Sequence, residues 1–332
     1  MPHAQTARLR APLSAAETIG VDLGGTKMLV GVVDSDRRVL HRATAPSVGL
    51  SEDELLRELE LRITEAREAR PDVVAVGLGI PCTIDHVRGV AITAVNLPII
   101  DVPIRDLIRE RVGLPVFLDN DANVAMIAEH RFGAAEHTRN AVMITVGTGI
   151  GGGLIIDGHI YRGSTGAAAE LGHVVVDLDG PKCQGNCPNY GCIEAVASGT
   201  ALGREGRSAA ERSPDSALGR TLAAGEEISG HSVTDAALAG DEAAREAVAL
   251  VGRRLGVAFS SYANVFDPEV IVVGGGVIAA GDLLLDPARE ELRSRALPPM
   301  NRTPVAAAQL GPEAGMIGAA AMAMLELKQA AT

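Results

Sequence analysis

The apolar positions along the chain form short unbroken runs that alternate with amphipathic stretches. Residues 73–80 and 270–276 begin as aliphatic runs of the kind that form buried parallel strands. Residues 51–70 instead follow the helical period, and Ser51 and Glu54 are placed as a capping box ahead of a leucine stripe. This alternation predicts an α/β fold with a parallel sheet.

Apolar strands run directly into glycine clusters at three places. Residues 18–33 and 141–156 each predict two strands joined by a tight glycine turn, and residues 270–276 predict a strand that ends in glycines before a helix from Val277. The repeated hairpin predicts duplicated cores that face each other over a cleft. We therefore divide the chain into a flexible arm (1–17), a small lobe (18–133, closed by a helix over 314–328) and a large lobe (134–313).

The remaining segments predict helices joined by loops. Helices are expected over 104–112, 122–132, 198–212, 233–239, 241–264 and 315–327. A short strand over 116–118 precedes the second of these helices. We expect a loop after Pro81 and a polar connection over 213–232.

Residues 170–194 concentrate the metal-binding side chains of the chain. His173, Cys183, Cys187 and Cys192 stand within 20 residues, with cysteine spacing C-x3-C-x4-C. Thiolates and an imidazole are the ligands of a closed tetrahedral zinc site, and a glycine-rich loop without a core gains a fixed shape from a metal. The alternative is three exposed cysteines in a disordered loop. We predict a structural zinc loop.

Two acidic residues are candidates for chemistry, although each has a simpler interpretation. Asp121 lies between a predicted strand and a predicted helix, at the sheet edge where α/β proteins bind ligands. It could accept a proton from a substrate hydroxyl, or Asp119 or Asp121 could merely cap the helix. Asp22 precedes a turn whose N–H groups, hydroxyl and ammonium could hold a phosphate, although an ordinary hairpin is equally open. That turn comprises Gly24, Gly25, Thr26 and Lys27.

Composition narrows the classes of function. The length of 332 residues suggests two domains, and a net charge of −12 with only 2% aromatic residues disfavours a nucleic-acid surface. No apolar segment is long enough to cross a membrane, and the N-terminus has no secretory signal. Three clustered cysteines and a single Cys82 favour a reducing, cytoplasmic setting.

Taken in order, these motifs resemble the ROK family of sugar kinases (glucokinase-like), in the actin/hexokinase-like superfamily of ATPases. The resemblance covers about residues 18–327. DLGGTK at 22–27 and TVGTGIGGG at 145–153 resemble the two phosphate loops, VVGGGV at 272–277 resembles the adenosine motif, and NDAN at 120–123 resembles the segment with the catalytic base. ELGH and GCxE resemble the segments that hold sugar hydroxyls.

The resemblance implies an α/β fold of two RNase H-like lobes, with mixed sheets flanked by helices and a cleft between the lobes. It also implies ATP- and Mg²⁺-dependent phosphorylation of a hexose 6-hydroxyl, foremost that of glucose. Asp121 would be the base and Asp22 the carboxylate nearest Mg²⁺. The sugar would contact Asn96, Asn120, Glu170, His173 and Glu194. Besides the first turn, ATP would contact Thr148, Gly149, Gly274 and Gly275. The family also implies a homodimer or homotetramer.

Departures from the family pattern leave the substrate open. The usual cysteine knuckle C-x-C-x4-C is two residues longer here, NLxGW appears as NLPIID from Asn96, and GxPG ends in Cys82. The altered NLPIID segment motivates an amino-sugar kinase, for kanosamine, N-acetylmannosamine or N-acetylglucosamine, as the second hypothesis. A sugar-responsive repressor is disfavoured because only about 20 residues precede Asp22, and an actin-like ATPase without a sugar site is disfavoured by the zinc loop.

Overall fold

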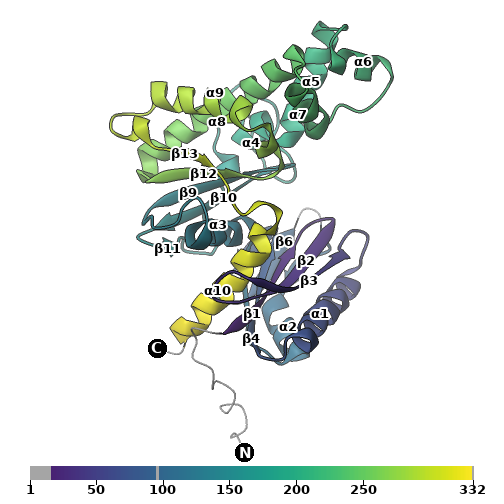
Figure 1. The fold of residues 1–332 in the computed structure, drawn as a ribbon, viewed down its shortest axis with the longest axis vertical. Coiled ribbons are helices and arrows are strands. Elements are labelled where there is room, and N and C mark those ends of the chain that lie inside the picture. Colours follow the sequence, from purple (N-terminus) through teal and green to yellow (C-terminus); the bar gives the residue numbers. More distant parts are fainter. Residues whose placement is uncertain (1–15, 95–96, 331–332) are drawn as a thin grey trace, which may run out of the picture. The chain divides into compact units, whose positions relative to one another are not determined.

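The protein is described by a computed structural model that covers residues 16–94 and 97–330. The predicted α/β class is confirmed, with mixed sheets and flanking helices. The chain forms two compact units (Figure 1). The first contains the described residues up to 136 together with 162–168 and 312–330, and the second contains 137–161 and 169–311. The first unit is thus assembled from three separate segments of chain.

The sheet of the first unit has five strands in the order β3-β2-β1-β4-β8. Its first three strands are antiparallel, and β4 and β8 are parallel to β1. The hairpin predicted over 18–33 is confirmed, because β1 and β2 pair with Leu23 opposite Met28. The strands are β1 (Glu17–Leu23), β2 (Lys27–Val33), β3 (Val39–Pro46), β4 (Val73–Ile80) and β8 (Val116–Asn120).

Four helices pack with this sheet: α1 (Glu52–Ala69), α2 (Ile104–Val112), α3 (Asp121–Phe132) and α10 (Ala314–Ala330). The predicted capping box of α1 is present, with Ser51 and Glu54 exchanging hydrogen bonds. Helix α10 lies directly on β1 and β4. A Cβ atom at Gly77 of β4 would stand only 1.9 Å from the carbonyl oxygen of Ala319, so the helix backbone rests on the strand.

The loop expected after Pro81 is wrong, because this region forms a three-stranded antiparallel sheet. Its strands are β5 (Cys82–Asp85), β6 (Val90–Ala94) and β7 (Ile100–Val102). The strands are only three to five residues long, too short for their periodicity to be read from the sequence.

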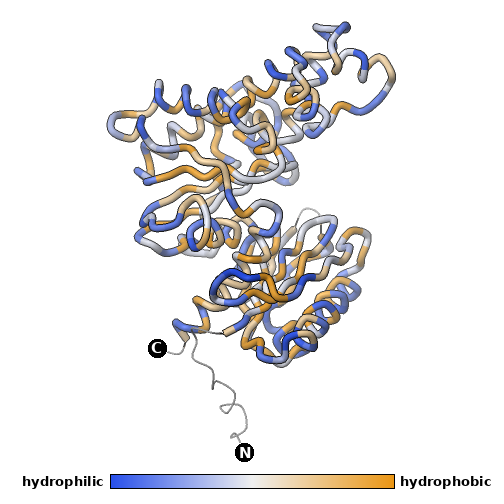
Figure 2. Tube along the Cα trace, in the orientation of Figure 1, coloured by the Kyte–Doolittle hydropathy of each residue, from blue (hydrophilic) through white to orange (hydrophobic). Residues whose placement is uncertain are grey.

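The sheet of the second unit repeats the plan of the first, in the order β11-β10-β9-β12-β13. The second predicted hairpin is confirmed, because β9 and β10 pair antiparallel, and β12 runs parallel to β9 as β4 runs parallel to β1. Figure 2 shows the strands of both sheets mainly in the hydrophobic colour. The strands are β9 (Ala141–Val146), β10 (Ile150–Ile156), β11 (His159–Ile160), β12 (Val270–Gly274) and β13 (Val305–Ala307).

The helices of the second unit differ from the expectation at two places. The connection expected over 213–232 contains helix α6 and the start of α7, and Val277 lies in a 3-10 turn (Gly276–Ala280) instead of an α-helix. The helices are α4 (Ile193–Ala197), α5 (Gly199–Arg212), α6 (Ala217–Ala223), α7 (Gly230–Leu238), α8 (Glu242–Phe266) and α9 (Asp282–Arg295). None of the described helices combines the length and apolarity that a membrane span requires.

Candidate active site

The first glycine turn joins β1 to β2 and is closed by backbone hydrogen bonds. The Gly24 N–H donates to the Lys27 carbonyl at 2.9 Å, and the Ser47 hydroxyl donates to the Gly24 carbonyl at 2.6 Å. Thr26 and Lys27 are exposed. The turn therefore has a fixed backbone and presents a hydroxyl and an ammonium to solvent, as a phosphate site requires.

Asp22, at the end of β1, is a largely buried carboxylate beside this turn. Its pKa is raised to about 6, mainly by burial and also by the negative charge of Asp121, while Lys27 opposes both effects. A Cβ atom at Gly315, in the first turn of α10, would stand 2.5 Å from the Asp22 carboxylate, so the side chain packs on the helix backbone. A cation bound nearby would stabilise the charged forms of these two carboxylates, which repel each other.

Asp121 is the first residue of α3, directly after strand β8. Asn120 is the residue that caps the helix, because its side-chain oxygen accepts from the Ala122 N–H at 2.9 Å. The same N–H also lies 2.9 Å from Oδ1 of Asp121. The Asn120 amide donates to the Cys82 carbonyl at 3.3 Å, which ties the cap to the segment GIPC. A carboxylate at a helix N-terminus is stabilised as an anion, the form that a general base needs.

The second glycine turn joins β9 to β10 and is held by Glu194. Its carboxylate accepts from the Ile150 N–H at 2.8 Å, and a Cβ atom at Gly149 would stand 2.4 Å from the same oxygen. Glu194 is in α4, two residues after Cys192. The residue thus joins the glycine turn to the cysteine loop, a structural role that the sequence did not indicate.

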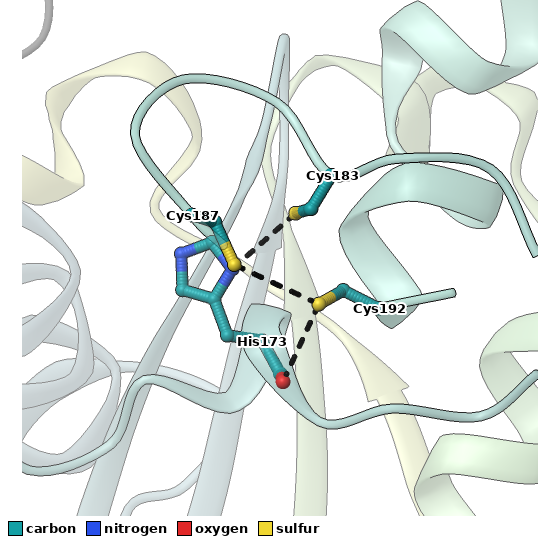
Figure 3. A group of neighbouring side chains, drawn as sticks. All are labelled: His173, Cys183, Cys187 and Cys192. Atoms are coloured by element: carbon teal, nitrogen blue, oxygen red, sulfur yellow. Dashed lines mark hydrogen bonds between the residues drawn. The ribbon is translucent and has the colours of Figure 1, made fainter. Parts of the chain in front are cut away.

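The four predicted metal ligands lie together in the second unit. The ligand atoms of His173, Cys183, Cys187 and Cys192 are all within 4.8 Å of one another, and Figure 3 shows their side chains converging. The Cys187 and Cys192 sulfurs are 3.9 Å apart, and Cys183 Sγ is 3.5 Å from His173 Nδ1.

These separations are those of a tetrahedral zinc site. Bonds of about 2.3 Å to sulfur and 2.0–2.1 Å to nitrogen place two sulfurs about 3.8 Å apart, and sulfur and nitrogen about 3.5 Å apart. Burial raises the pKa of the Cys183 and Cys192 thiols, which a metal would offset by binding the thiolates. The donor set therefore fits zinc, and the two extra residues between Cys183 and Cys187 do not prevent the four ligands from converging.

The segment ELGH presents Glu170 and His173 on the same short turn. With Nδ1 of His173 directed at Cys183, its Nε2 lies 3.9 Å from a carboxylate oxygen of Glu170. The Glu170 side chain is 59% exposed. Below it, the buried Tyr262 hydroxyl donates to the Leu171 carbonyl at 2.6 Å and fixes the turn from the core side. Two polar groups are thus held side by side at the surface, ready to accept and donate hydrogen bonds.

A cavity of about 520 Å³ opens beside the second glycine turn, within the second unit. Its walls come from that turn, from the first turns of α5 and α7, and from Gly276 and Val277. Helix N-termini attract anionic groups, and a cavity of this size accommodates a nucleoside. The lining residues are Gly147, Thr148, Gly199, Thr200, Gly203, Arg204, Arg207, 227–231, Thr234, Gly276 and Val277.

The sequence identified only part of this cavity. Thr148 lines it, and Gly274 and Gly275 directly precede its wall residue Gly276. The contributions of Arg204 and His231 were missed, because the distant helices that carry them show no motif. A signal was available in Ser198 and Ser229, which cap α5 and α7 ahead of glycines that line the cavity.

The predicted site residues divide between the two units. The first unit holds the first turn, Asp22, Asn120 and Asp121, and the second holds the second turn, the cysteine loop, Glu170, His173 and Glu194. Asn96, expected at the sugar, lies outside the described residues.

Comparison with known proteins agrees with this arrangement. The sequence profile of the ROK family matches residues 18–326, and the chain belongs to this family. Its fold is accordingly of the actin/hexokinase-like type. Glucokinase of Thermotoga maritima is 37% identical over 92% of this chain and 96% of its own.

Solved structures give the same result. The ROK-family glucokinase of Streptomyces griseus, in complex with glucose and AMPPNP, is 38% identical, with a TM-score of 0.82 over 93% of this chain and all of its own. A ROK-family transcriptional regulator has a TM-score of 0.84 over 93% of this chain and 78% of its own, at 27% identity. The fold is therefore shared by kinases and regulators, so the fold alone does not tell which of the two classes a protein belongs to. That distinction depends on the residues of the functional site.

Proposed function

We propose that the protein is a glucokinase that transfers the γ-phosphoryl group of ATP to the 6-hydroxyl of glucose. The observation that carries the proposal is the 38% identity, over nearly the full length of both chains, to an enzyme crystallised with glucose and an ATP analogue. The regulator of the same fold is only 27% identical. Two glycine turns, a nucleotide-sized cavity and a carboxylate at the start of α3 support the proposal.

Asp121 is proposed as the general base. Its carboxylate takes the proton of the sugar hydroxyl as the hydroxyl oxygen bonds to the γ-phosphorus of ATP, while the bond from that phosphorus to the bridging oxygen breaks and releases ADP. Asp121 is the first residue of α3, and the positive end of the helix dipole favours a negative charge at that position. The two glycine turns, through backbone N–H groups and Thr26, Lys27, Thr148 and Gly149, hold the phosphates.

Asp22 is the carboxylate proposed to hold Mg²⁺, because it is largely buried and its charge is repelled by that of Asp121. When bound, Mg²⁺ supplies neutralisation of the charge on the transferred phosphoryl group. The sugar hydroxyls are proposed to contact Asn120, Glu170, His173 and Glu194. Zinc in the cysteine loop would fix Nδ1 of His173 and leave Nε2 to face the sugar, a structural role without part in the proton transfer.

The test is an ADP-coupled assay with glucose, ATP and Mg²⁺. Asp121→Asn keeps the shape of the helix start and removes the base, so kcat should fall about 10²–10⁴-fold while glucose affinity measured by calorimetry changes little. Asp36→Asn, at an exposed turn of the same unit, is the matched control and should retain wild-type kcat. Retention of most of the rate in the Asp121 variant would refute its role as base, and an inactive wild type would refute the proposed reaction.

An amino-sugar kinase is the second candidate, and one contact favours it. The altered segment GIPC touches the proposed sugar residue Asn120 through the Cys82 carbonyl. A substitution there can change which groups the sugar must offer. Competition of kanosamine, N-acetylmannosamine and N-acetylglucosamine against glucose in one assay distinguishes the two, because the preferred sugar suppresses phosphorylation of the others.

We also propose that the enzyme acts in a reducing, cytoplasmic setting as a homodimer or homotetramer, without nucleic acid or membrane partners. All four cysteines, which lie in the described residues, are free of disulfides, as a reducing compartment requires. Light scattering coupled to size-exclusion chromatography would measure the oligomeric state directly. A monomer at micromolar concentration would contradict this part of the proposal.

A further inference from the structure

A partly buried ion-pair network lies next to the segment that carries the candidate base, and it includes an arginine to which the proposed mechanism gives no role. The guanidinium of Arg162 donates to Oδ2 of Asp119 at 2.7 Å and to Oε1 of Glu326 at 3.0 Å. We propose that Arg162 is a positioning residue for phosphoryl transfer, which holds the Asp119–Asp121 segment in its reactive geometry. The inference rests on the proposed kinase function and assigns Arg162 no contact with substrate.

Arg162 begins a segment that leaves its neighbours in sequence to join the first unit. Residues 162–168 pack there, although 137–161 and 169–311 belong to the second unit. The segment is closely fitted, because a Cβ atom at Gly166 would stand 2.7 Å from the Ile84 carbonyl oxygen. Arg162 thus joins three distant parts of the chain, namely this segment, the end of β8 and helix α10.

Asp119 transmits the position of Arg162 to the base. The Asp119 side chain is 2% exposed, and its Oδ1 accepts from the Asn120 N–H and from the Asn123 amide, both at 2.8 Å. Its other oxygen is held by Arg162. Asn120 in turn caps the helix that starts at Asp121. A rotation of the Asp119 carboxylate would therefore move the backbone that carries the base.

The charges around this network make Arg162 hard to replace. Asp22 and Asp121 repel each other, and the buried Asp119 adds a third carboxylate to the same strand ends. Lys27 acts on Asp22, and His86 faces Glu326 at 4.0 Å with its other ring nitrogen 3.0 Å from the Leu118 carbonyl. In the described part of the chain, Arg162 is the cation paired with Asp119. Its loss would leave a buried carboxylate without a counter-charge.

The experiment compares Arg162→Gln and Arg162→Lys with Arg62→Gln. Arg62 is a matched control, because it also pairs with two carboxylates, Glu58 at 2.7 Å and Glu65 at 2.8 Å, but lies on α1. We expect Arg162→Gln to lower kcat about 10- to 100-fold with KM for glucose and ATP within about 3-fold of wild type. Arg62→Gln should leave all three constants unchanged.

The pH profile of kcat separates positioning from a merely structural role. Loss of the guanidinium leaves nearby carboxylates less stabilised as anions, so the acid limb in Arg162→Gln should move to higher pH. A variant that is only less stable would show fewer active sites by burst titration, with kcat per active site and the pH profile unchanged. That result would overturn the proposal, as would a change confined to KM, which would indicate substrate contact.

Arg162→Lys keeps the proposal testable if the Gln variant does not fold. Lysine retains the charge but cannot hold both carboxylates with a rigid fork, so kcat should fall about 3- to 10-fold with KM unchanged. Wild-type kcat and pH profile in this variant would refute the inference. Failure of the wild-type enzyme to phosphorylate any sugar would instead refute the proposed function, so the two failures are distinguishable.

Discussion

The buried negative charge of Asp22, the residue proposed to hold Mg²⁺, is expected to destabilise the folded protein. Burial and the charge of Asp121 raise its pKa from an ordinary 3.8 to about 6. One pKa unit corresponds to about 1.4 kcal/mol, so at neutral pH the buried anion costs the folded state about 3 kcal/mol. Substitution of Asp22 by Asn, which is neutral and of similar shape, should recover part of this cost.

The pH dependence fixes the sign of the effect. Between about pH 4 and pH 6 the folded protein keeps a proton on Asp22 that the unfolded chain has released, so this group's contribution to stability falls as pH rises through that window. Above about pH 6 the cost is constant. Asp22→Asn should therefore be about 1–3 kcal/mol more stable than wild type at pH 7.5, and only about 0.5 kcal/mol more stable near pH 4.

The assay is urea denaturation at the two pH values without nucleotide or metal, followed by circular dichroism. Hydrogen exchange of peptides from β1 and β4 assigns the transition to the first unit. Asp36→Asn is the control, because Asp36 is exposed, and its stability should stay within about 0.5 kcal/mol of wild type. Equal stability of wild type and Asp22→Asn at pH 7.5, or the same difference at both pH values, would refute the reasoning.

Three further changes test other parts of the structure. Cys187→Ser removes one of four converging sulfur and nitrogen ligands. Zinc content measured by atomic absorption should fall, and KM for glucose should rise about 10-fold or more. Unchanged zinc content would contradict the proposed ligand set. Tyr262→Phe leaves the Leu171 carbonyl without its 2.6 Å donor. The free energy of unfolding, measured by denaturation, should fall by about 1–3 kcal/mol. An unchanged value would mean that water replaces the hydroxyl. Gly275→Ala places a Cβ atom 2.4 Å from the Val146 carbonyl oxygen at a φ of 86°, so we expect a loss of several kcal/mol, and a stable, active variant would show that this turn can shift.

The sequence predicted the elements whose signals are local. The two hairpins combine apolar strands with glycine turns, and Ser51 with Glu54 marks a helix start, so each could be located without knowledge of the partner strand. The cysteine loop was predictable because soft ligands close together in sequence have few other uses. The strands β5, β6 and β7 were missed because they are stabilised by pairing with one another. Such pairing between short segments leaves no recognisable pattern in the sequence.

Contacts between distant segments could not be predicted from the sequence. Asp119 looked like a possible helix cap, and only the fold shows that it is paired with Arg162, 43 residues away. The cavity wall from α5 and α7 is likewise assembled by packing, with Arg204 and His231 on helices that carry no nucleotide motif. Glu194 was predicted to contact the sugar from its motif, but its hydrogen bond from the Ile150 N–H could be seen only in the three-dimensional structure.

The placement of α10 on β1 and β4 has a consequence for synthesis of the protein. Translation completes every residue of the second unit, which ends at 311, before the helix that covers the first sheet has been made. The face of the first sheet around Gly77 therefore stays uncovered until residues 314–330 have emerged from the ribosome. Multidomain chains usually mature from the N-terminus, but here the later-encoded unit can finish first. A released chain truncated after residue 311 should accordingly show a protease-resistant second unit beside a protease-sensitive first one.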